Sequence, residues 1–359
     1  MPSYITAIGT VNPAFVIPQA EVIDFMINAH GLNDKEAHQL RLLYRASGIT
    51  QRFTTIPDYA NSVREFYPKN DQLEPFPDME MRSKWYRKYA APLSRKAVLD
   101  AVGESFDFKS ITHLITVSCT GMYAPGLDID LVRSLDLSTN VERTSINFMG
   151  CYAAFNALKV ANHIVRSSDA RVLIVCTELC TLHFQKEKTE DNLLANALFG
   201  DGSAAVLVEN NPSDKSIELN EFRNFLLPET ENEMAWSIGN FGFEMRLSNY
   251  VPDALKIGIQ PLLKSLSIKP DTFDYYAIHP GGKKILEVVE KELGITKETN
   301  RHAHDVLRQN GNMSSPTILF ILKKILEECT SDDDGKSLLS VAFGPGLTLE
   351  SLTATIHSK

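Results

Sequence analysis

Three residues far apart in the chain carry groups that together can transfer an acyl group: Cys151, His279 and Asn312. We expect a helix to begin at Cys151, the candidate nucleophile. A thiol in the first turn of a helix lies at the positive end of the helix dipole, which lowers the thiol pKa. His279 can hold the sulfur as a thiolate–imidazolium pair that attacks an acyl thioester near neutral pH. Asn312 is a neutral donor that can share with His279 the stabilisation of an oxyanion or enolate.

Each of these residues also has an ordinary structural explanation. A cysteine that opens an apolar helix is often just a small buried hydrophobic residue. His279 precedes Pro-Gly-Gly and can be a turn residue, and Asn312 can be a helix cap. Chemistry is therefore inferred from their positions relative to one another and not from any one of them.

The two halves of the chain place these residues in matched positions. In the first half, a strand-like run ends at Cys119, and Cys151 opens a helix 32 residues later. In the second half, a strand-like run ends at His279, and Asn312 opens a helix 33 residues later. A buried strand follows each helix. One design therefore occurs twice, and a pseudo-twofold axis between the copies would bring Cys151, His279 and Asn312 to one cavity. The four strands expected at these places are residues 113–118, 171–178, 273–278 and 337–343.

The remaining elements follow from hydrophobic periodicity and turn residues. Helices are expected at residues 19–29, 34–47, 86–102, 249–266, 283–293 and 315–328. Strands are expected at residues 3–10, 144–148, 204–208 and 347–356, with an irregular segment at 56–81, a turn at 199–203 and a linker at 210–215.

Composition indicates an ordinary globular protein. The 359 residues are 43% hydrophobic and 23% charged, enough for a large core and two structural units. The net charge of −9 and the pI near 5.5 disfavour a nucleic acid or an anionic membrane as partner. Five cysteines are an odd number, so we expect no disulfide framework and a cytoplasmic location. We also expect no signal peptide and no membrane span.

His302 and His304 form a His-x-His pair without further ligands nearby in the sequence, so we interpret them as part of a solvated loop. No metal site is expected. Arg41 and Arg45 lie one helical turn apart, which is typical of a solvated helix face and also suits a phosphate contact.

Four motifs occur in order: ALFGDG at residues 197–202, HPGG at 279–282, GNMSS at 311–315 and FGPGLTLE at 343–350. With them the chain resembles the type III polyketide synthases, the chalcone synthase-like branch of the thiolase superfamily, over nearly its whole length. The resemblance implies an α/β fold of five αβαβα layers, built from two pseudo-twofold-related halves and assembled as a homodimer. Residues 1–211 would form the half with Cys151, and residues 212–359 the half with His279 and Asn312.

The resemblance also implies an activity, that of an acyltransferase without metal or cofactor whose substrates are CoA thioesters. Cys151 would take a starter from an acyl-CoA, and malonyl-CoA would lose carbon dioxide beside His279 and Asn312. The resulting enolate would attack the thioester, and the extended chain would cyclise to a pyrone, a resorcinol or another small aromatic.

Further site residues follow from the resemblance. Phe199 matches the family's gatekeeper, and Met245 stands where a second gatekeeper is normally phenylalanine. Ala124 corresponds to the residue that plugs the partner subunit's cavity, and Arg41 and Arg45 lie in the region that meets CoA phosphates. The cavity-lining positions are Cys119, Thr120, Cys180, Leu182, His183, Trp236 and Ser314.

Trp236 replaces a glycine of the plant enzymes, so we expect an acyl chain or a malonyl unit as starter and not a coumaroyl group. Two alternatives remain: a ketoacyl synthase III-like enzyme that makes one condensation onto a carrier protein, and a non-catalytic thiolase-fold partner subunit. Hydroxymethylglutaryl-CoA synthase is disfavoured because its glutamate cannot be placed.

Overall fold

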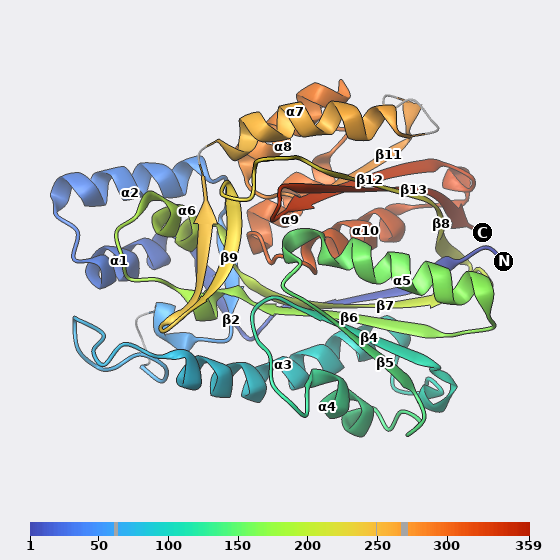
Figure 1. Ribbon diagram of the computed structural model, residues 1–359, viewed down its shortest axis with the longest axis horizontal. Coiled ribbons are helices and arrows are strands. Elements are labelled where there is room, and N and C mark those ends of the chain that lie inside the picture. The colour runs from blue at the N-terminus through green and yellow to red at the C-terminus, as the bar shows by residue number, and fades with distance from the viewer. Residues whose placement is uncertain (61–63, 249, 267–271) are drawn as a thin grey trace.

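The computed structural model describes residues 1–60, 64–248, 250–266 and 272–359. Its elements form five layers (Figure 1). Helices α7 (Val251–Lys264) and α8 (Lys283–Leu293) cover one outer face, and α3 (Met79–Val102) and α4 (Leu127–Ser134) cover the other. Helices α5 (Ala153–Ser167) and α10 (Thr317–Glu328) lie in the middle, between the two halves of the sheet. The predicted αβαβα arrangement is confirmed.

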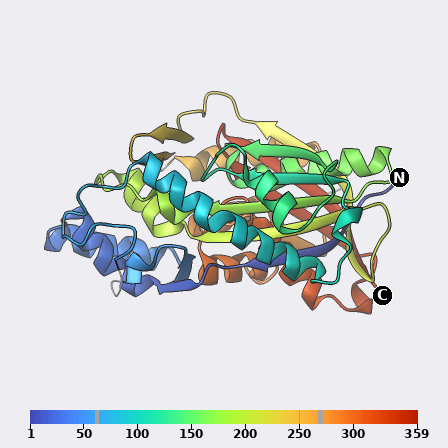
Figure 2. The same cartoon turned by 90° about the horizontal axis from the view of Figure 1, so that it is seen from below.

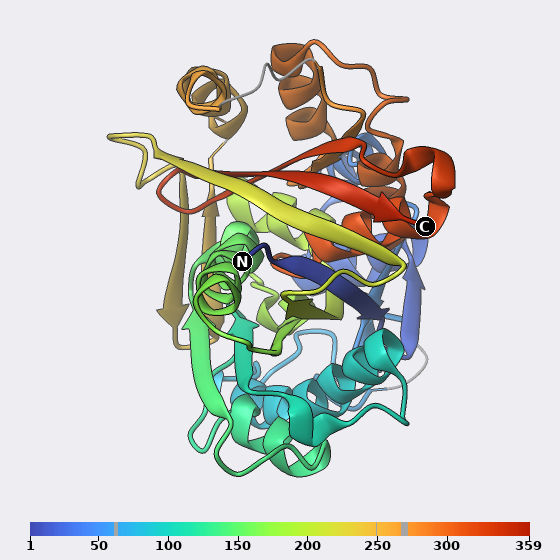
Figure 3. The ribbon, with the colours of Figure 1, turned by 90° about the vertical axis from the view of Figure 1, so that its right-hand side faces the viewer.

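The described strands include a nine-stranded sheet made of two consecutive halves. β1 and β8 join the halves, paired at Tyr4–Glu218 and Ile5–Ile217, and lie side by side in Figure 3. In sheet order the strands are β11 (Tyr275–Ile278), β12 (Ser337–Gly344), β13 (Thr348–Ser358), β8 (Lys215–Leu226), β1 (Tyr4–Val11), β7 (Asp201–Glu209), β6 (Val172–Leu179), β4 (His113–Ser118) and β5 (Glu142–Asn147).

The two halves repeat one strand pattern. In the first, β4 runs parallel to β6, β6 antiparallel to β7, and β7 antiparallel to β1. In the second, β11 runs parallel to β12, β12 antiparallel to β13, and β13 antiparallel to β8. A parallel pair needs a crossover connection, and α5 and α10 lie in those crossovers. The duplication predicted from residue spacing is therefore confirmed in the topology.

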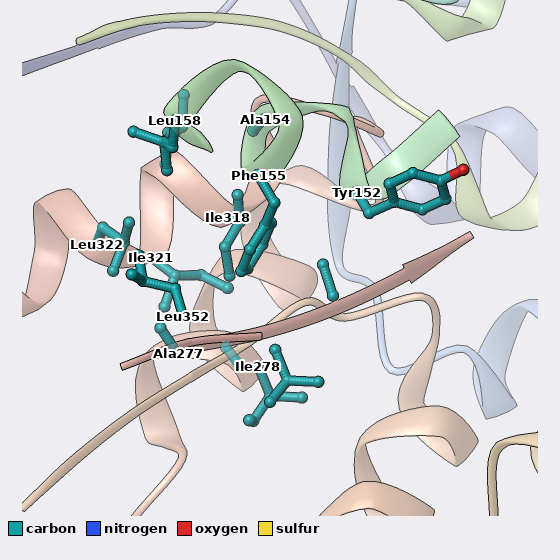
Figure 4. Close-up of a cluster of buried hydrophobic side chains, with 14 of the residues drawn as sticks. Tyr152, Ala154, Phe155, Leu158, Ala277, Ile278, Ile318, Ile321, Leu322 and Leu352 are labelled. Carbon is teal, nitrogen blue, oxygen red and sulfur yellow. The ribbon is translucent and has the colours of Figure 1, made fainter. Parts of the chain in front are cut away.

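The core between the halves includes Tyr152 and Ile278, which are the chain neighbours of Cys151 and His279 (Figure 4). Ala153, Ala154 and Ala157 of α5 are fully buried, and their small side chains allow α5 to approach the sheet closely. Phe155 of α5 and Ile318 of α10 belong to the same hydrophobic cluster (Figure 4). This core holds the start of α5 and the end of β11 in fixed relation, and with them Cys151 and His279.

The other described elements surround one end of this sheet. Seen from below, α3 lies across the sheet face, and α1 and α2 project beyond its end (Figure 2). These elements are α1 (Gln19–His30), α2 (Asp34–Ala46), α6 (Glu190–Leu198), α9 (Arg301–Asn310), and the hairpins β2 (Phe15–Pro18) with β3 (Gln51–Thr54) and β9 (Met234–Gly239) with β10 (Gly242–Leu247). Within the described ranges, no helix has the length and apolar character needed to cross a membrane.

Several local predictions are wrong. Asn312 does not open a helix: α10 begins at Thr317, because residues 312–316 form a separate loop. The expected turn at residues 199–203 already contains the start of β7, at Asp201. The strands β8, β9 and β10 were not predicted. Residue 249, at the start of the expected helix 249–266, and residues 267–271, between that helix and the expected strand 273–278, lie outside the described residues.

The interpretation of His302 and His304 as a solvated loop is also wrong. Both belong to α9. His302 is buried with its Nε2 2.8 Å from a Glu328 oxygen, and the Nε2 of His304 is 2.6 Å from a Glu290 oxygen. The pair connects α9 to α10 and α8 through carboxylate contacts, because the helix presents alternate sides to two neighbouring helices.

Candidate active site

Cys151 lies at the junction of the two halves. It sits in a 3-10 turn, Gly150–Tyr152, between β5 and the first residue of α5. Gly150 has φ 76°, and a Cβ there would lie 2.4 Å from the Pro345 Cδ, in the turn between β12 and β13. Only glycine fits this left-handed, crowded position, which brings the thiol against the second half.

His279 directly follows β11, and its backbone N–H donates to the Val341 carbonyl at 2.8 Å. Its side chain is fully buried and meets the Phe343 ring edge-on, with centroids 5.7 Å apart. Among the described residues neither ring nitrogen has a hydrogen-bond partner. A buried imidazole in this state is costly unless a ligand completes its hydrogen bonds, so the ring is available to a substrate.

Asn312 lies in the loop before α10 and pairs with Phe199 in an isolated β-bridge. Its Nδ2 lies 3.8 Å from the Cys151 Sγ, and its Oδ1 lies 3.9 Å from the same sulfur. The Oδ1 accepts a 2.8 Å hydrogen bond from the Ser314 N–H, where the chain turns sharply with φ 59°. The amide oxygen is therefore engaged, and Nδ2 is the donor that faces the reaction space.

These three residues line one pocket, called here the Cys151 pocket, with a volume of about 40 Å³. The spacing argument is confirmed to the extent that residues from both halves share this cavity. The other residues of its wall are Cys119, Thr120, Gly150, Cys180, Phe199, Met234, Trp236, Met245, Leu247, Gly281, Ser314, Phe343 and Pro345.

Burial controls the charge of the two reactive groups. It raises the pKa of the Cys151 thiol to about 11 and lowers the pKa of His279 to about 3. The expectation that a helix terminus lowers the thiol pKa is therefore wrong, because Cys151 precedes α5 and loses more solvation than the helix end returns. Burial by itself therefore favours the neutral thiol and the neutral imidazole.

A second pocket adjoins the first, and four residues line both: Cys180, Phe199, Trp236 and Met245. Trp236 is fixed in this shared wall because its Nε1 donates to the Cys119 carbonyl at 2.7 Å. The partition therefore consists of large side chains, including the gatekeeper positions expected from the sequence.

His183 and Leu182 lie elsewhere than expected. His183 lines the second pocket and not the Cys151 pocket. Its Nδ1 accepts from the Phe243 N–H at 2.9 Å, so its Nε2 donates to the Thr120 carbonyl at 2.6 Å. Burial lowers its pKa to about 3, which keeps the ring neutral. Leu182 is fully buried and lines neither pocket.

A third cavity, the α2–α8 pocket, adjoins the Cys151 pocket on another side and has a volume of about 270 Å³. The residues common to both are Met234, Leu247, Gly281 and Phe343. Its rim includes Lys283 and Lys284, which are exposed at the start of α8. It is therefore a surface approach to Cys151.

Arg41, Arg45 and Ala124 lie outside these cavities. Arg41 pairs with Asp24 at 3.4 Å, and Arg45 is exposed on the same helix. Ala124 lines a separate pocket beside β5, together with residues such as Arg143. The described chain therefore does not place Ala124 against its own Cys151.

Glu178 was missed by sequence reasoning. It is fully buried in β6, and burial raises its pKa to about 7. Its carboxylate accepts from the Cys119 N–H at 2.9 Å, the Thr120 hydroxyl at 2.7 Å and the Ser315 hydroxyl at 2.6 Å. It therefore connects the pocket wall of one half with the Asn312 loop of the other. The available signal was a single acid in an otherwise apolar strand, VLIVCTEL.

Comparison with known families gives two adjacent matches. The family model for "Chalcone and stilbene synthases, N-terminal domain" matches residues 2–212, and that for the C-terminal domain matches residues 218–358.

Two relatives are similar over 97% of this chain. "Probable polyketide synthase 1" of Dictyostelium discoideum is 31% identical, and the chain spans 11% of that protein's length. "Alpha-pyrone synthesis polyketide synthase-like Pks18" of Mycobacterium tuberculosis is 29% identical, with 90% of its length covered.

Two solved structures are similar over 99% of this chain. The C-terminal type III polyketide synthase domain of Steely1 from Dictyostelium has a TM-score of 0.89 at 28% identity, with all of that chain covered. PKS-I from the brown alga Ectocarpus siliculosus has a TM-score of 0.90 at 26% identity, with 98% of that chain covered.

Proposed function

This chain belongs to the chalcone and stilbene synthase family of type III polyketide synthases, and we propose that Cys151 carries its starter and growing chain. The observation that supports this assignment is the shared burial of Cys151, His279 and Asn312 in one cavity, with both His279 nitrogens unpartnered among the described residues. A thiol, a base and an amide donor around one space suit acyl transfer.

The reaction begins with transfer of an acyl group from CoA to the Cys151 sulfur. His279 takes the thiol proton, the thioester bond to CoA breaks, and the proton leaves with the CoA thiol. Malonyl-CoA then loses carbon dioxide, and the enolate oxygen accepts hydrogen bonds from His279 and from the Asn312 Nδ2. The enolate carbon attacks the acyl thioester, and the sulfur of Cys151 is released.

The apolar walls support the decarboxylation step. Phe199 and Phe343 line the Cys151 pocket, and an apolar surface around a malonyl carboxylate disfavours its charge and promotes its loss. We assign Phe199 and Met245 as gatekeepers because both line the Cys151 pocket, which the α2–α8 pocket adjoins.

The proposed starter is an acyl chain or a malonyl unit, and the proposed product is a pyrone, a resorcinol or another small aromatic. Trp236 lines the Cys151 pocket and is fixed there by its hydrogen bond to the Cys119 carbonyl, which supports a narrow acyl chain over a flat aromatic starter. The name of the mycobacterial relatives refers to alpha-pyrone synthesis, which supports the same class of product.

The test is to incubate the purified enzyme with malonyl-CoA and acyl-CoAs of graded length, and to identify products by mass spectrometry. We expect pyrones or resorcinols from chains and at least about tenfold lower kcat/KM for coumaroyl-CoA, a difference of about 1.4 kcal/mol. Efficient formation of naringenin chalcone would overturn the starter assignment. A requirement for carrier protein with a single extension would instead favour the ketoacyl synthase III-like alternative.

Trp236 variants provide the matched control for this test. Trp236→Ala removes the partition and should move the preferred starter to longer chains. Trp236→Phe keeps a large ring but loses the hydrogen bond to the Cys119 carbonyl, and should keep the original length preference. If both variants shift alike, the hydrogen bond and not the volume sets the preference.

We propose that CoA thioesters approach through the α2–α8 pocket, with their phosphates near Lys283 and Lys284. Arg41 and Arg45 are weaker candidates because neither lines the α2–α8 pocket; Arg41 pairs with Asp24, and Lys283 likewise lies 3.8 Å from a Glu287 oxygen. Lysine ammonium groups act as point charges on phosphates, and two of them on the rim suit an anionic carrier group.

Lys283→Glu with Lys284→Glu should raise the KM for malonyl-CoA about tenfold or more, because two favourable charges become repulsive. The same double variant should use malonyl-N-acetylcysteamine, which has no phosphates, as well as the wild type does. Lys291→Glu, an exposed position later on α8, is the matched control and should leave both KM values unchanged. Equal KM increases for both substrates would exclude phosphate recognition by the lysines.

We further propose a homodimer and a cytoplasmic location, with the halves divided at residues 211 and 212. β5 is an edge strand whose residues are mostly exposed, and Met122, beside Ala124, is 44% exposed. An exposed strand edge suits pairing with a second copy. Sedimentation velocity would show a monomer if this assignment is wrong.

The five cysteines are all free and buried, which suits a reducing compartment.

A further inference from the structure

Arg52 is a buried cation that holds backbone carbonyls beside the candidate active site. It belongs to β3 and is 4% exposed. Its Nη1 donates to the Phe199 carbonyl at 2.6 Å and to the Asn196 carbonyl at 2.7 Å, and its Nε donates to the Gln19 Oε1 at 2.9 Å. Within the described residues, no carboxylate forms an ion pair with it.

This arrangement is specific to a guanidinium. A planar fork can satisfy acceptors from α1 and from the end of α6 at the same time, whereas a lysine ammonium has no such fork. Burying a charged group without an opposite charge is unfavourable unless its hydrogen bonds are satisfied. A neutral side chain of similar volume would be less costly to bury at position 52 than this charged guanidinium. The arginine there therefore indicates a role beyond packing.

The Phe199 carbonyl that Arg52 binds belongs to the segment that pairs with Asn312. Phe199 and Asn312 pair in a β-bridge, in which the Asn312 N–H donates to the Leu198 carbonyl at 2.9 Å and the Gly200 N–H donates to the Asn312 carbonyl at 2.9 Å. The backbone of Asn312 is thus hydrogen-bonded to residues 198–200. Arg52 binds a carbonyl of the same segment.

The stem of Arg52 contacts the other side of this loop. A Cβ on Gly311 would lie 3.1 Å from the Arg52 Cγ and Cδ, and a Cβ on Gly200 would lie 3.5 Å from the Arg52 Cβ. The side chain therefore packs between the segments before Asn312 and after Phe199. Both segments depend on it for their spacing.

We propose that Arg52 is a positioning residue for malonyl-CoA decarboxylation. By fixing the Phe199 carbonyl and the adjoining bridge, it holds the Asn312 Nδ2 at 3.8 Å from the Cys151 sulfur. The inference rests on the proposed function, since it assigns a task within that reaction. Arg52 lines the second pocket but touches neither the reacting atoms nor the Cys151 pocket, and it acts on the reaction through the position of Asn312.

The first experiment compares two steps that depend on different residues. Arg52→Met should lower the kcat of malonyl-CoA decarboxylation at least tenfold with less than a twofold change in KM. Alkylation of Cys151 by iodoacetamide should change much less than decarboxylation does, because Asn312 is only one of the hydrogen-bond partners that lower the thiol pKa. Arg52→Lys should recover part of the kcat, since an ammonium reaches one carbonyl. Loss of both activities in proportion would mean that Arg52 only supports the fold.

Arg82→Met is the matched control. Arg82 is equally buried and likewise donates to two carbonyls, those of Pro77 and Leu182, but it has no bond to the Phe199–Asn312 bridge. It should lower the melting temperature as Arg52→Met does while decarboxylation per folded enzyme stays within twofold of the wild type. A tenfold kcat loss in Arg82→Met would remove the specificity claimed for Arg52.

Two further measurements test the path through Asn312. In an Asn312→Ala background, Arg52→Met should reduce the residual decarboxylation by less than twofold, whereas an independent tenfold loss would overturn the inference. A crystal structure of Arg52→Met should show the Asn312 Nδ2 moved away from the Cys151 sulfur, and an unchanged position would overturn it too. A wild-type enzyme that does not decarboxylate malonyl-CoA would count against the proposed function, while the crystal structure would still test Arg52.

Discussion

Replacement of Cys151 by alanine should abolish polyketide formation while malonyl-CoA decarboxylation continues. Without the sulfur no acyl-enzyme thioester can form, so we expect product formation to fall by on the order of 10⁴-fold or more. Decarboxylation should stay within about tenfold of the wild type, because the enolate is stabilised by His279 and Asn312 and needs no thiolate. Mass spectrometry of products and release of labelled carbon dioxide measure the two steps separately.

Two other cysteines provide the thiol controls for this variant. Cys176 is buried inside β6 and Cys329 follows α10, and neither lines the Cys151 pocket. Alanine at either position should leave condensation within about twofold, since each loses one sulfur away from the reaction space. Continued condensation in Cys151→Ala would show that the assigned nucleophile is wrong.

Replacement of His279 by glutamine should lower both acyl transfer and decarboxylation by about 10²–10⁴-fold, because a single imidazole serves as base in one step and as donor in the other. Glutamine keeps hydrogen-bonding capacity and approximate size but cannot take up a proton near neutral pH. Separate assays of Cys151 acylation and of carbon dioxide release would show whether both steps fall.

The same variant makes a pH-dependent prediction about the thiol. Burial raises the pKa of Cys151 to about 11, so without a base only about one thiol in 10⁴ is ionised at pH 7. In the wild type we propose that His279 accepts the proton, which would favour the thiolate and lower the apparent pKa. The alkylation rate of His279→Gln at pH 7 should therefore fall and recover only as pH rises toward 11.

Iodoacetamide alkylation of Cys151 across pH 6–11, followed by intact-protein mass spectrometry, would measure this profile. Asn312→Ala provides the comparison, since it removes a neutral donor and no base, and should move the profile less than His279→Gln does. Superimposable profiles for wild type and His279→Gln would show that the imidazole does not activate the sulfur.

The candidate site was partly predictable because its chemistry lies in short motifs. HPGG and GNMSS mark His279 and Asn312 as turn and loop residues. At Gly150 the hydrophobic periodicity changes from that of a strand to that of a helix, and this change marks the break before Cys151. The layered fold and the family were predicted correctly from these motifs and from the repeated spacing, and the comparisons confirm both.

Other features could not be predicted because they depend on contacts between distant segments. Asn312 is followed by a good helical pattern, but its backbone bonds to Leu198 and Gly200 hold it outside α10. His302 and His304 suggested a solvated loop, because nothing in the local sequence shows that Glu328 and Glu290 lie opposite them. The partition around Trp236 likewise combines residues of β9 and β10 with the residues that directly follow β6 and α6.

By itself the sequence determined most of the helices and central strands, which family the chain belongs to, and which thiol, imidazole and amide are available for chemistry, because periodicity, turn glycines and motifs act over a few residues. Only the tertiary structure decided the burial of that thiol and imidazole and the placement of Arg52 against the segment that pairs with Asn312. Those properties arise where segments from both halves exclude water from one small volume: burial raises the pKa of Cys151 and lowers that of His279, and a remote guanidinium becomes a neighbour of the site.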